Sequence, residues 1–99
     1  MNIALDYDNT LTLDVRTWEN VVALLSRAGH SVYLVTARLD SSMGPLEWLR
    51  EHPNLKGVFN TNLQAKRPYM EDRGIEIDVW IDDMPRSVNE DIPDINKGP

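Results

Sequence analysis

Short apolar runs alternate with helical periodicities along the first half of the chain. Residues Ile3 to Leu5 and Val32 to Val35 are continuous apolar runs, as expected of strands that are buried on both faces. Between them, apolar residues recur at helical spacing from Thr17 to Ala28, with Thr17 in the N-cap position and Gly29 after the last turn. This order predicts an α/β domain in which right-handed crossovers connect parallel strands.

The second half of the chain continues the alternation with shorter elements. We expect a helix from near Ser42 that ends before Pro53, because the residue preceding a proline avoids helical geometry. The stretch "KGVFN" (56–60) predicts a third strand, and "IEIDVWIDD" (75–83) predicts a fourth. A brief helical segment is expected between them, from about Pro68 to Arg73. The pattern therefore predicts a mostly parallel sheet of about four strands.

Composition and charge narrow the class of protein. The 99 residues are enough for one domain (1–99), and the polar, proline-containing stretch from about 87 to 99 predicts a weakly structured tail. The absence of cysteine excludes disulfides and thiolate metal sites. A formal net charge of -6 argues against general binding to the nucleic-acid backbone, although a nucleotide or a nucleic-acid end could still be a substrate.

Hydropathy gives no sign of a membrane protein. No apolar run approaches the length of a membrane span, and the N-terminus lacks the basic-then-apolar pattern of a signal peptide. We therefore expect a cytoplasmic protein that does not act at a membrane. The sequence leaves the oligomeric state open.

Polar side chains follow the predicted strands at the points where they end. Asp6 and Asp8 follow the first strand, Thr36 ends the second, and Asp82 and Asp83 end the last. The carboxyl ends of parallel strands share one edge of a sheet, where ligands bind. Two carboxylates about 4 Å apart repel by roughly 4 kcal/mol at an effective dielectric near 20, so the cluster must take up protons or bind a cation. An oxygen-only ligand set favours a hard ion, and Mg²⁺ is the natural candidate.

The same residue types suit phosphoryl transfer. An aspartate can act as the nucleophile and form an aspartyl-phosphate, while a second carboxyl group protonates the leaving oxygen and then activates water. The Thr36 hydroxyl and a positive charge from Lys66, which follows the third strand, would hold the other phosphoryl oxygens.

The stretch "DYDNT" at 6–10 matches the DxDxT signature of the haloacid dehalogenase-like (HAD) superfamily, and the chain resembles its phosphatase branch. A strand ending in Thr36, then Lys66, then "IDD" at 81–83 follow in the order of the family's other motifs. The resemblance covers residues 3–83. It implies a Rossmann-like three-layer sandwich whose short, mostly parallel sheet has the strand order 4-1-2-3.

The resemblance also implies a role for each motif residue. Asp6 would be the nucleophile and Asp8 the general acid/base, Thr36 and Lys66 would bind the phosphoryl group, and Thr10 would brace the loop after the first strand. The magnesium ligands that it implies are the Asp6 carboxylate, the Asp8 backbone carbonyl, Asp82 and, directly or through water, Asp83.

Several assignments near the motifs stay open. Arg67 competes with the favoured Lys66 for the third-motif role, and Lys56 is a distant third because it precedes the third strand. Arg38 either reaches the mouth of the site and supports substrate binding or is simply solvated. Tyr7 is expected to point its side chain away from the metal while its backbone N–H helps to hold phosphate.

Residues outside the motifs have simpler interpretations. Trp18, Trp48 and Trp80 follow apolar periodicities and are expected to pack in the core, Trp48 being the least certain of the three. His30 and His52 fall at the wrong ends of their elements for this chemistry and are interpreted as surface residues.

The family resemblance further implies that the protein lacks a cap domain. Only a small hairpin flap, "LTLDV" (11–15), fits between Thr10 and the following helix, and the interval from Thr36 to Lys66 holds one helix and one strand. We expect a capless, Mg²⁺-dependent phosphatase that acts on a phosphorylated small molecule, a nucleotide or the end of a macromolecule. Two alternatives remain, which are a non-enzymatic phosphate- or metal-binding regulatory module and a phosphotransferase. The order of the motifs disfavours a receiver domain of two-component signalling.

Overall fold

The computed structural model describes residues 1–94 and contains a parallel sheet of four strands. The strands lie in the order β3-β2-β1-β4, and every neighbouring pair is parallel. Central β1 pairs Ala4 with Tyr33 of β2 and with Trp80 of β4. The predicted α/β class and strand order are therefore confirmed. The strands are β1 (Asn2–Leu5), β2 (Ser31–Thr36), β3 (Gly57–Asn60) and β4 (Val79–Ile81).

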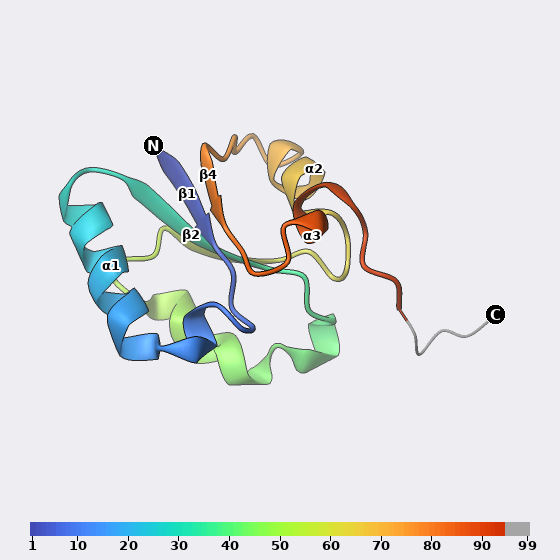
Figure 1. The fold of residues 1–99 in the computed structure, drawn as a ribbon, viewed down its shortest axis with the longest axis horizontal. Helices are drawn as coiled ribbons and strands as arrows, with labels where there is room; N and C mark the ends of the chain where they lie inside the picture. The colour runs from blue at the N-terminus through green and yellow to red at the C-terminus, as the bar shows by residue number, and fades with distance from the viewer. Residues whose placement is uncertain (95–99) are drawn as a thin grey trace.

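Helical segments cover both faces of this sheet (Figure 1). Because alternate residues of a strand face opposite sides, Ile3 and Leu5 of β1 face one apolar cluster and Ala4 faces the other. The first cluster includes Val22 and Leu46, and the second includes Met70. The segments are η1 (Leu11–Leu13), α1 (Val15–Arg27), η2 (Asp40–Ser42), η3 (Gly44–Glu51), α2 (Lys66–Glu71) and α3 (Arg86–Asn89), where η denotes a 3₁₀ helix.

The segment between β1 and α1 differs from the prediction in two ways. Leu11–Leu13 forms a turn of 3₁₀ helix in place of the expected hairpin flap, because Leu11 is buried and draws the chain inward. The N-cap of α1 is Asp14, not Thr17. Its carboxylate accepts hydrogen bonds from the Thr17 N–H (3.1 Å) and from the Thr17 hydroxyl (2.7 Å). Within residues 1–94, no cap domain is inserted between β1 and α1 or between β2 and α2.

Elements of the second half also depart from their expected bounds. The helix expected from Ser42 is divided into η2 and η3 at Met43, and β4 is limited to Val79–Ile81, where it pairs with β1. Helix α2 begins at Lys66 instead of near Pro68. Trp48 is 50% exposed, so its predicted burial was wrong, whereas Trp18 and Trp80 pack against the two apolar clusters.

The end of the described chain is more ordered than predicted. Helix α3 packs beside α2, and its Ser87 and Val88 are only 4% exposed, so the expected tail does not begin at residue 87. Val88 lies on the inner side of this short helix, and burial of its side chain favours an ordered segment. The part of the expected tail at 95–99 lies outside the described residues. His30 and His52 are half-buried, and neither lines the cavity that contains the motif residues.

Candidate active site

The motif residues border a cavity at the carboxyl ends of β1, β2 and β4. Its volume is about 170 Å³, which accommodates a phosphoryl group but not a large substrate. Four carboxylates and two cationic side chains contribute to its wall. The lining consists of Asp6, Asp8, Asn9, Thr36, Ala37, Arg38, Lys66, Asp82, Asp83, Met84, Ser87 and Ile92.

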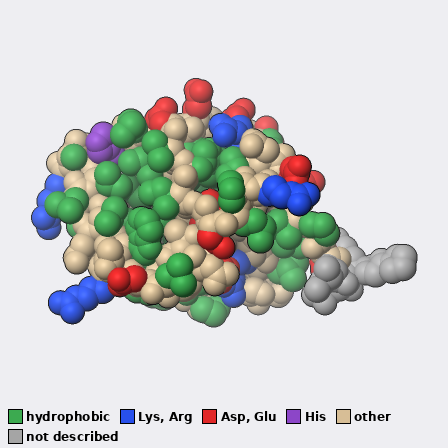
Figure 2. Space-filling model, viewed as in Figure 1, with side chains coloured by type: hydrophobic (Ala, Val, Ile, Leu, Met, Phe, Trp, Pro, Cys, Tyr) green, Lys and Arg blue, Asp and Glu red, His purple; other side chains and the backbone are tan. Residues whose placement is uncertain are grey.

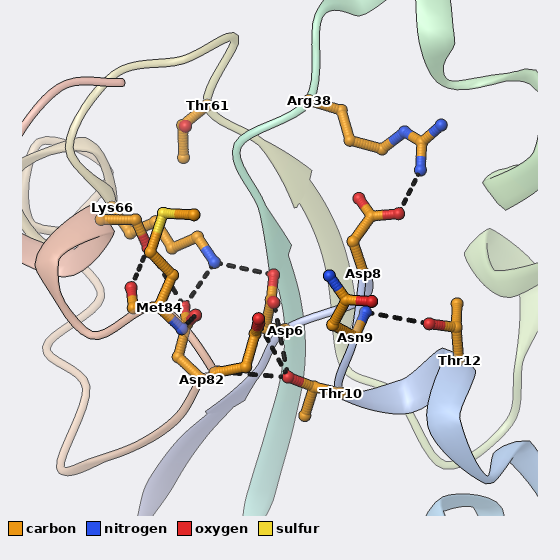
Figure 3. A network of polar contacts seen from close by, with 12 residues as sticks. Asp6, Asp8, Asn9, Thr10, Thr12, Arg38, Thr61, Lys66, Asp82 and Met84 are labelled. Atoms are coloured by element: carbon orange, nitrogen blue, oxygen red, sulfur yellow. Dashed lines mark hydrogen bonds and ion pairs between the residues drawn. The ribbon is translucent and has the colours of Figure 1, made fainter. Parts of the chain in front are cut away.

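Asp6 lies directly after β1 and is 8% exposed. Its N–H donates to the Ile81 carbonyl at 2.9 Å, which extends the pairing of β1 with β4 by one residue. Its carboxylate accepts a hydrogen bond from the Lys66 ammonium at 2.8 Å (Figure 3). The same ammonium lies 2.5 Å from Asp82, so one buried cation joins two strand ends.

Burial dominates the ionisation of Asp6. Loss of hydration raises its pKa from 3.8 to about 6, against the lowering effect of Lys66. A hydrogen bond with Asp83 and the charge of Asp82 raise the pKa further. Asp6 is therefore a carboxylate whose negative charge is poorly compensated by the protein alone.

Thr10 connects the two acidic ends of the site. It is 6% exposed, and its hydroxyl lies 3.4 Å from an Asp6 oxygen and 3.3 Å from an Asp83 oxygen. The Asp83 N–H also approaches this hydroxyl at 3.3 Å. The preceding residue, Asn9, has a φ of 58°, a left-handed conformation that asparagine tolerates better than most residues. The loop after β1 thus turns back so that Thr10 faces the cluster.

Asp6, Asp82 and Asp83 form a group that could hold a metal ion, since one oxygen from each lies within 4.8 Å of the others. The chemistry of these donors fits a hard divalent cation. A cation there would also reduce the repulsion that raises the pKa of Asp6. The Asp8 carboxylate is not part of this group, and the expected ligation by its backbone carbonyl stays a prediction.

The side chain of Asp8 points away from Lys66 and toward Arg38 (Figure 3). One Asp8 oxygen accepts a hydrogen bond from Arg38 Nη1 at 2.8 Å, and the Asp8 side chain is 54% exposed. Arg38 therefore forms an ion pair with a motif residue. The sequence had suggested only that Arg38 supports substrate binding or is solvated. Its guanidinium also lies 5.6 Å from the ring of Tyr7.

The other candidates fall inside or outside the cavity. Thr36 is 1% exposed and lines it. Lys66 also lines the cavity. Arg67 is not among the lining residues of the described part of the chain: it donates a hydrogen bond to Asn89 at 3.0 Å, and its guanidinium lies over the Trp80 ring. The geometry thus favours Lys66 over Arg67. The Tyr7 side chain packs against the apolar core, and the part assigned to its backbone N–H stays a prediction.

Sequence reasoning missed two contributors on the segment after β4. The Ser87 hydroxyl donates to the Met84 carbonyl (2.7 Å) and lies 3.4 Å from Asp82, and the Met84 N–H donates to the other Asp82 oxygen (2.9 Å). The only sequence signal was the position of Ser87 shortly after the acidic pair. A four-residue helix is too short to show a periodicity.

Comparisons of the chain with protein-family models, with curated proteins and with solved structures found no significant match. Among the described residues, no helix combines the length and the hydrophobicity needed to cross a lipid bilayer. On the face drawn in Figure 2, basic side chains lie apart from one another among acidic and apolar ones. This face offers no continuous basic surface for a polyanion.

Proposed function

We propose that the protein is a Mg²⁺-dependent phosphohydrolase that cleaves phosphate monoesters through an aspartyl-phosphate on Asp6. The observation that carries the proposal is the position of Asp6. It is buried at a strand end, bonded to Lys66, and close enough to Asp82 and Asp83 to share a metal ion. A solvated turn or a helix cap needs neither a buried lysine nor a converging acidic group.

Two steps account for the reaction. An Asp6 oxygen attacks phosphorus, the bond to the leaving oxygen breaks, and Asp8 gives that oxygen its proton. Water then attacks the phosphorus of the acyl phosphate while Asp8 takes a proton from it, which releases inorganic phosphate and restores the Asp6 carboxylate. Thr36 and Lys66, which line the cavity, would bind the non-bridging oxygens.

Asp6, Asp82 and Asp83 would hold the magnesium ion. When bound, Mg²⁺ would supply positive charge that offsets the charge of the transferring phosphoryl group. The parallel sheet, covered on both faces, supports the finer proposal of a capless Rossmann-like sandwich of the HAD type.

The direct test is phosphate release from an aryl phosphate by the protein with Mg²⁺ and with chelator. We expect turnover only with the metal, and a loss of about 10³-fold or more in Asp6→Asn, because the nucleophile is then missing. The matched control is Asp72→Asn, which replaces the exposed C-cap residue of α2 and should retain activity. Absence of phosphate release across a broad panel of monoesters, with Mg²⁺ present and folding verified, would contradict the proposal.

One observation favours a second candidate, a regulatory module that binds phosphate or metal without turnover. Asp8, the residue assigned to proton transfer, is paired with Arg38 and does not contact Asp6 in the described contacts. A module of this kind would retain phosphate on Asp6. A phosphorylated Asp6 that persists for hours after treatment with acetyl phosphate would support it over the hydrolase.

A further inference from the structure

Arg38 is held at the mouth of the cavity by contacts that leave part of its guanidinium unused. Its Nε donates to the Ser42 carbonyl at 3.0 Å, and its Nη1 donates to Asp8 at 2.8 Å. The Tyr7 ring lies 5.6 Å from the guanidinium carbon. Among the contacts of residues 1–94, Nη2 has no partner, and the side chain is 22% exposed. Arg38 is therefore oriented in advance and can still accept an anion.

The pairing with Arg38 does not suit the proton transfer proposed for Asp8. The Asp8 carboxylate that would have to reach a leaving oxygen beside Asp6 is held by Arg38 Nη1 at 2.8 Å. The Asp8 side chain is also turned toward Arg38 and away from Lys66 (Figure 3). Proton transfer to a leaving group near Asp6 therefore requires that Asp8 first separates from Arg38.

The exposure of the Asp8–Arg38 ion pair allows Arg38 to exchange Asp8 for another anion. Asp8 is 54% exposed, and ion pairs in contact with water contribute little to stability. A phosphate group offers Arg38 the same kind of charged, two-oxygen acceptor that a carboxylate does. The Nε contact to Ser42 would hold the guanidinium in place during the exchange.

The charges and the size of the cavity indicate where a second anion would bind. Lys66 is 2% exposed and already lies between Asp6 and Asp82, whereas Arg38 is the more accessible of the two cations in the described lining. A cavity of about 170 Å³ accommodates the reacting phosphoryl group, and a larger substrate would extend from it on the exposed side, where Arg38 lies. An anionic group there meets Arg38.

We propose that Arg38 exchanges Asp8 for a second anionic group of the substrate, and that this exchange frees Asp8 for proton transfer. The inference rests on the proposed phosphohydrolase. It names the substrate class as phosphate monoesters that carry a second phosphate or phosphodiester near the reacting phosphoryl group. Sugar bisphosphates and nucleotides share this chemistry, and the test includes both.

The experiment compares paired substrates with Mg²⁺ present. One pair is glucose 1-phosphate and glucose 1,6-bisphosphate, and the other is a nucleoside 3′-monophosphate and a dinucleotide with a 3′-phosphate. We expect kcat/KM to be about tenfold or more higher for the member with the second anion, in at least one pair, because a charge-assisted arginine contact is gained. The pair that shows the preference identifies the source of the anion.

Arg38→Ala should reduce that preference to within about threefold, mainly through a higher KM for the substrate with two anions. Arg38→Lys should restore only part of it, since a lysine cannot offer the planar fork. The ratio within a pair is insensitive to the fraction of folded enzyme. Arg50→Ala, which removes an exposed arginine paired with Glu47 at 3.1 Å, is the matched control and should keep the full preference.

Asp8→Asn supplies a second measurement that does not need turnover. It removes the competing carboxylate and leaves the guanidinium intact, so calorimetry in chelator, where neither protein should turn the substrate over, should show about tenfold tighter binding of the substrate with two anions than wild type does. A merely structural Arg38 would not produce this gain.

The inference would be overturned if wild type showed no higher kcat/KM for the substrate with the second anion, or if Arg38→Ala kept that preference. The proposed function would still stand in either case, provided that turnover of an aryl phosphate depended on Asp6. Unchanged or weaker binding to Asp8→Asn would also overturn it. Failure of every substrate, the aryl phosphate included, would remove the proposed function and the inference with it.

Discussion

The ammonium of Lys66 lies 2.8 Å from a carboxylate oxygen of Asp6, 60 residues earlier in the chain. Lys66 is 2% exposed, and its second partner is Asp82, which follows β4. The first residue of α2 is thereby joined to the ends of two neighbouring strands. A buried charge needs such partners, because water cannot hydrate it. The contact fixes the position of Asp6 and leaves both aspartates with further oxygen lone pairs for a cation.

Replacing Lys66 by methionine should destabilise the metal-free protein. The change leaves two poorly hydrated carboxylates without their shared cation, and breaking a buried pair in this way costs about 3–5 kcal/mol. Urea unfolding at pH 7 in chelator measures the loss. The loss should be smaller at pH 5, where Asp6 can take up a proton instead.

Arg67→Ala is the control for that experiment, because Arg67 is adjacent in sequence but pairs with Asn89 and the Trp80 ring outside the cavity. Its free energy of unfolding should fall by only about 1 kcal/mol or less. Equal losses in the two variants, or no pH dependence in Lys66→Met, would argue that the buried ion pair contributes little.

The raised pKa of Asp6 predicts that its contribution to stability falls as the pH rises. With a pKa of about 6 in the folded protein and 3.8 as the ordinary value, the folded state binds more protons than the unfolded chain between these limits. The contribution is therefore complete below about pH 3.8 and is lost as the pH passes through about 6.

The substitution Asp6→Asn removes the titrating carboxyl group, so comparing this variant with wild type tests the prediction. In chelator, the unfolding free energy of Asp6→Asn minus that of wild type should increase from pH 4 to pH 7, because only wild type must hold a buried charge at the higher pH. Asp72→Asn, which makes the same substitution at an exposed position outside the cavity, controls for the change of residue type. A flat difference for Asp6→Asn would mean that its carboxylate is not penalised by burial.

The sheet and the cluster at its edge followed from the sequence because they depend on simple periodicities. Continuous apolar runs identified β1 and β2, and parallel strands bring their carboxyl ends to one edge whatever the details of the loops. The neighbourhood of β1 and β4, which brings Asp6 and Asp82 together, was implied by the family resemblance and not by the periodicities. Long-range convergence was thus the more predictable part of the site.

Local contacts were less predictable, since several residue types could satisfy them. Thr17 was the N-cap expected from the sequence, but aspartate caps helices at least as well, and Asp14 occupies the position through its bonds to Thr17. The four-residue α3 lacked a detectable period. The Asp8–Arg38 pair depends on the rotamers of two long or exposed side chains, which no pattern of apolar positions determines.

Thr10→Val should weaken both the fold and the proposed activity. Valine has the same shape but no hydroxyl, so the Asp83 N–H loses a contact at 3.3 Å and the two carboxylates lose a shared neighbour. We expect the free energy of unfolding to fall by about 1–2 kcal/mol. With the loop after β1 held less firmly against Asp83, kcat/KM should fall by about tenfold or more.

Thr12→Val is the matched change two residues away. Among residues 1–94, the exposed Thr12 hydroxyl has a single contact, the hydrogen bond it accepts from the Asn9 N–H at 2.9 Å. It should retain activity to within about threefold. Thr10→Ser keeps the hydroxyl and should resemble wild type in both assays. Should Thr10→Ser be as impaired as Thr10→Val, the methyl group, and not the hydroxyl, would be the important part of Thr10.

Asp91→Ala should disturb Lys66 from a distance. The Asp91 carboxylate accepts a bond from the N–H of Ala65, the N-cap of α2, at 2.7 Å, and the next residue, Ile92, donates its N–H to the Leu63 carbonyl at 2.7 Å. Leu63 has a φ of 71°, which is unfavourable for leucine and needs support from its surroundings. Removing the carboxylate leaves a partly buried N–H unpaired and should cost about 1–2 kcal/mol.

Because α2 begins at Lys66, loosening its N-terminus should also lower kcat/KM by about threefold to tenfold. Glu90→Ala tests the specificity of the effect, since Glu90 pairs only with exposed Arg86 in the described contacts and its loss should cost about 0.5 kcal/mol or less. Crystal structures of both variants would show whether Lys66 has shifted. If Asp91→Ala lost stability but kept full activity, the segment after α3 would support the fold without positioning the site.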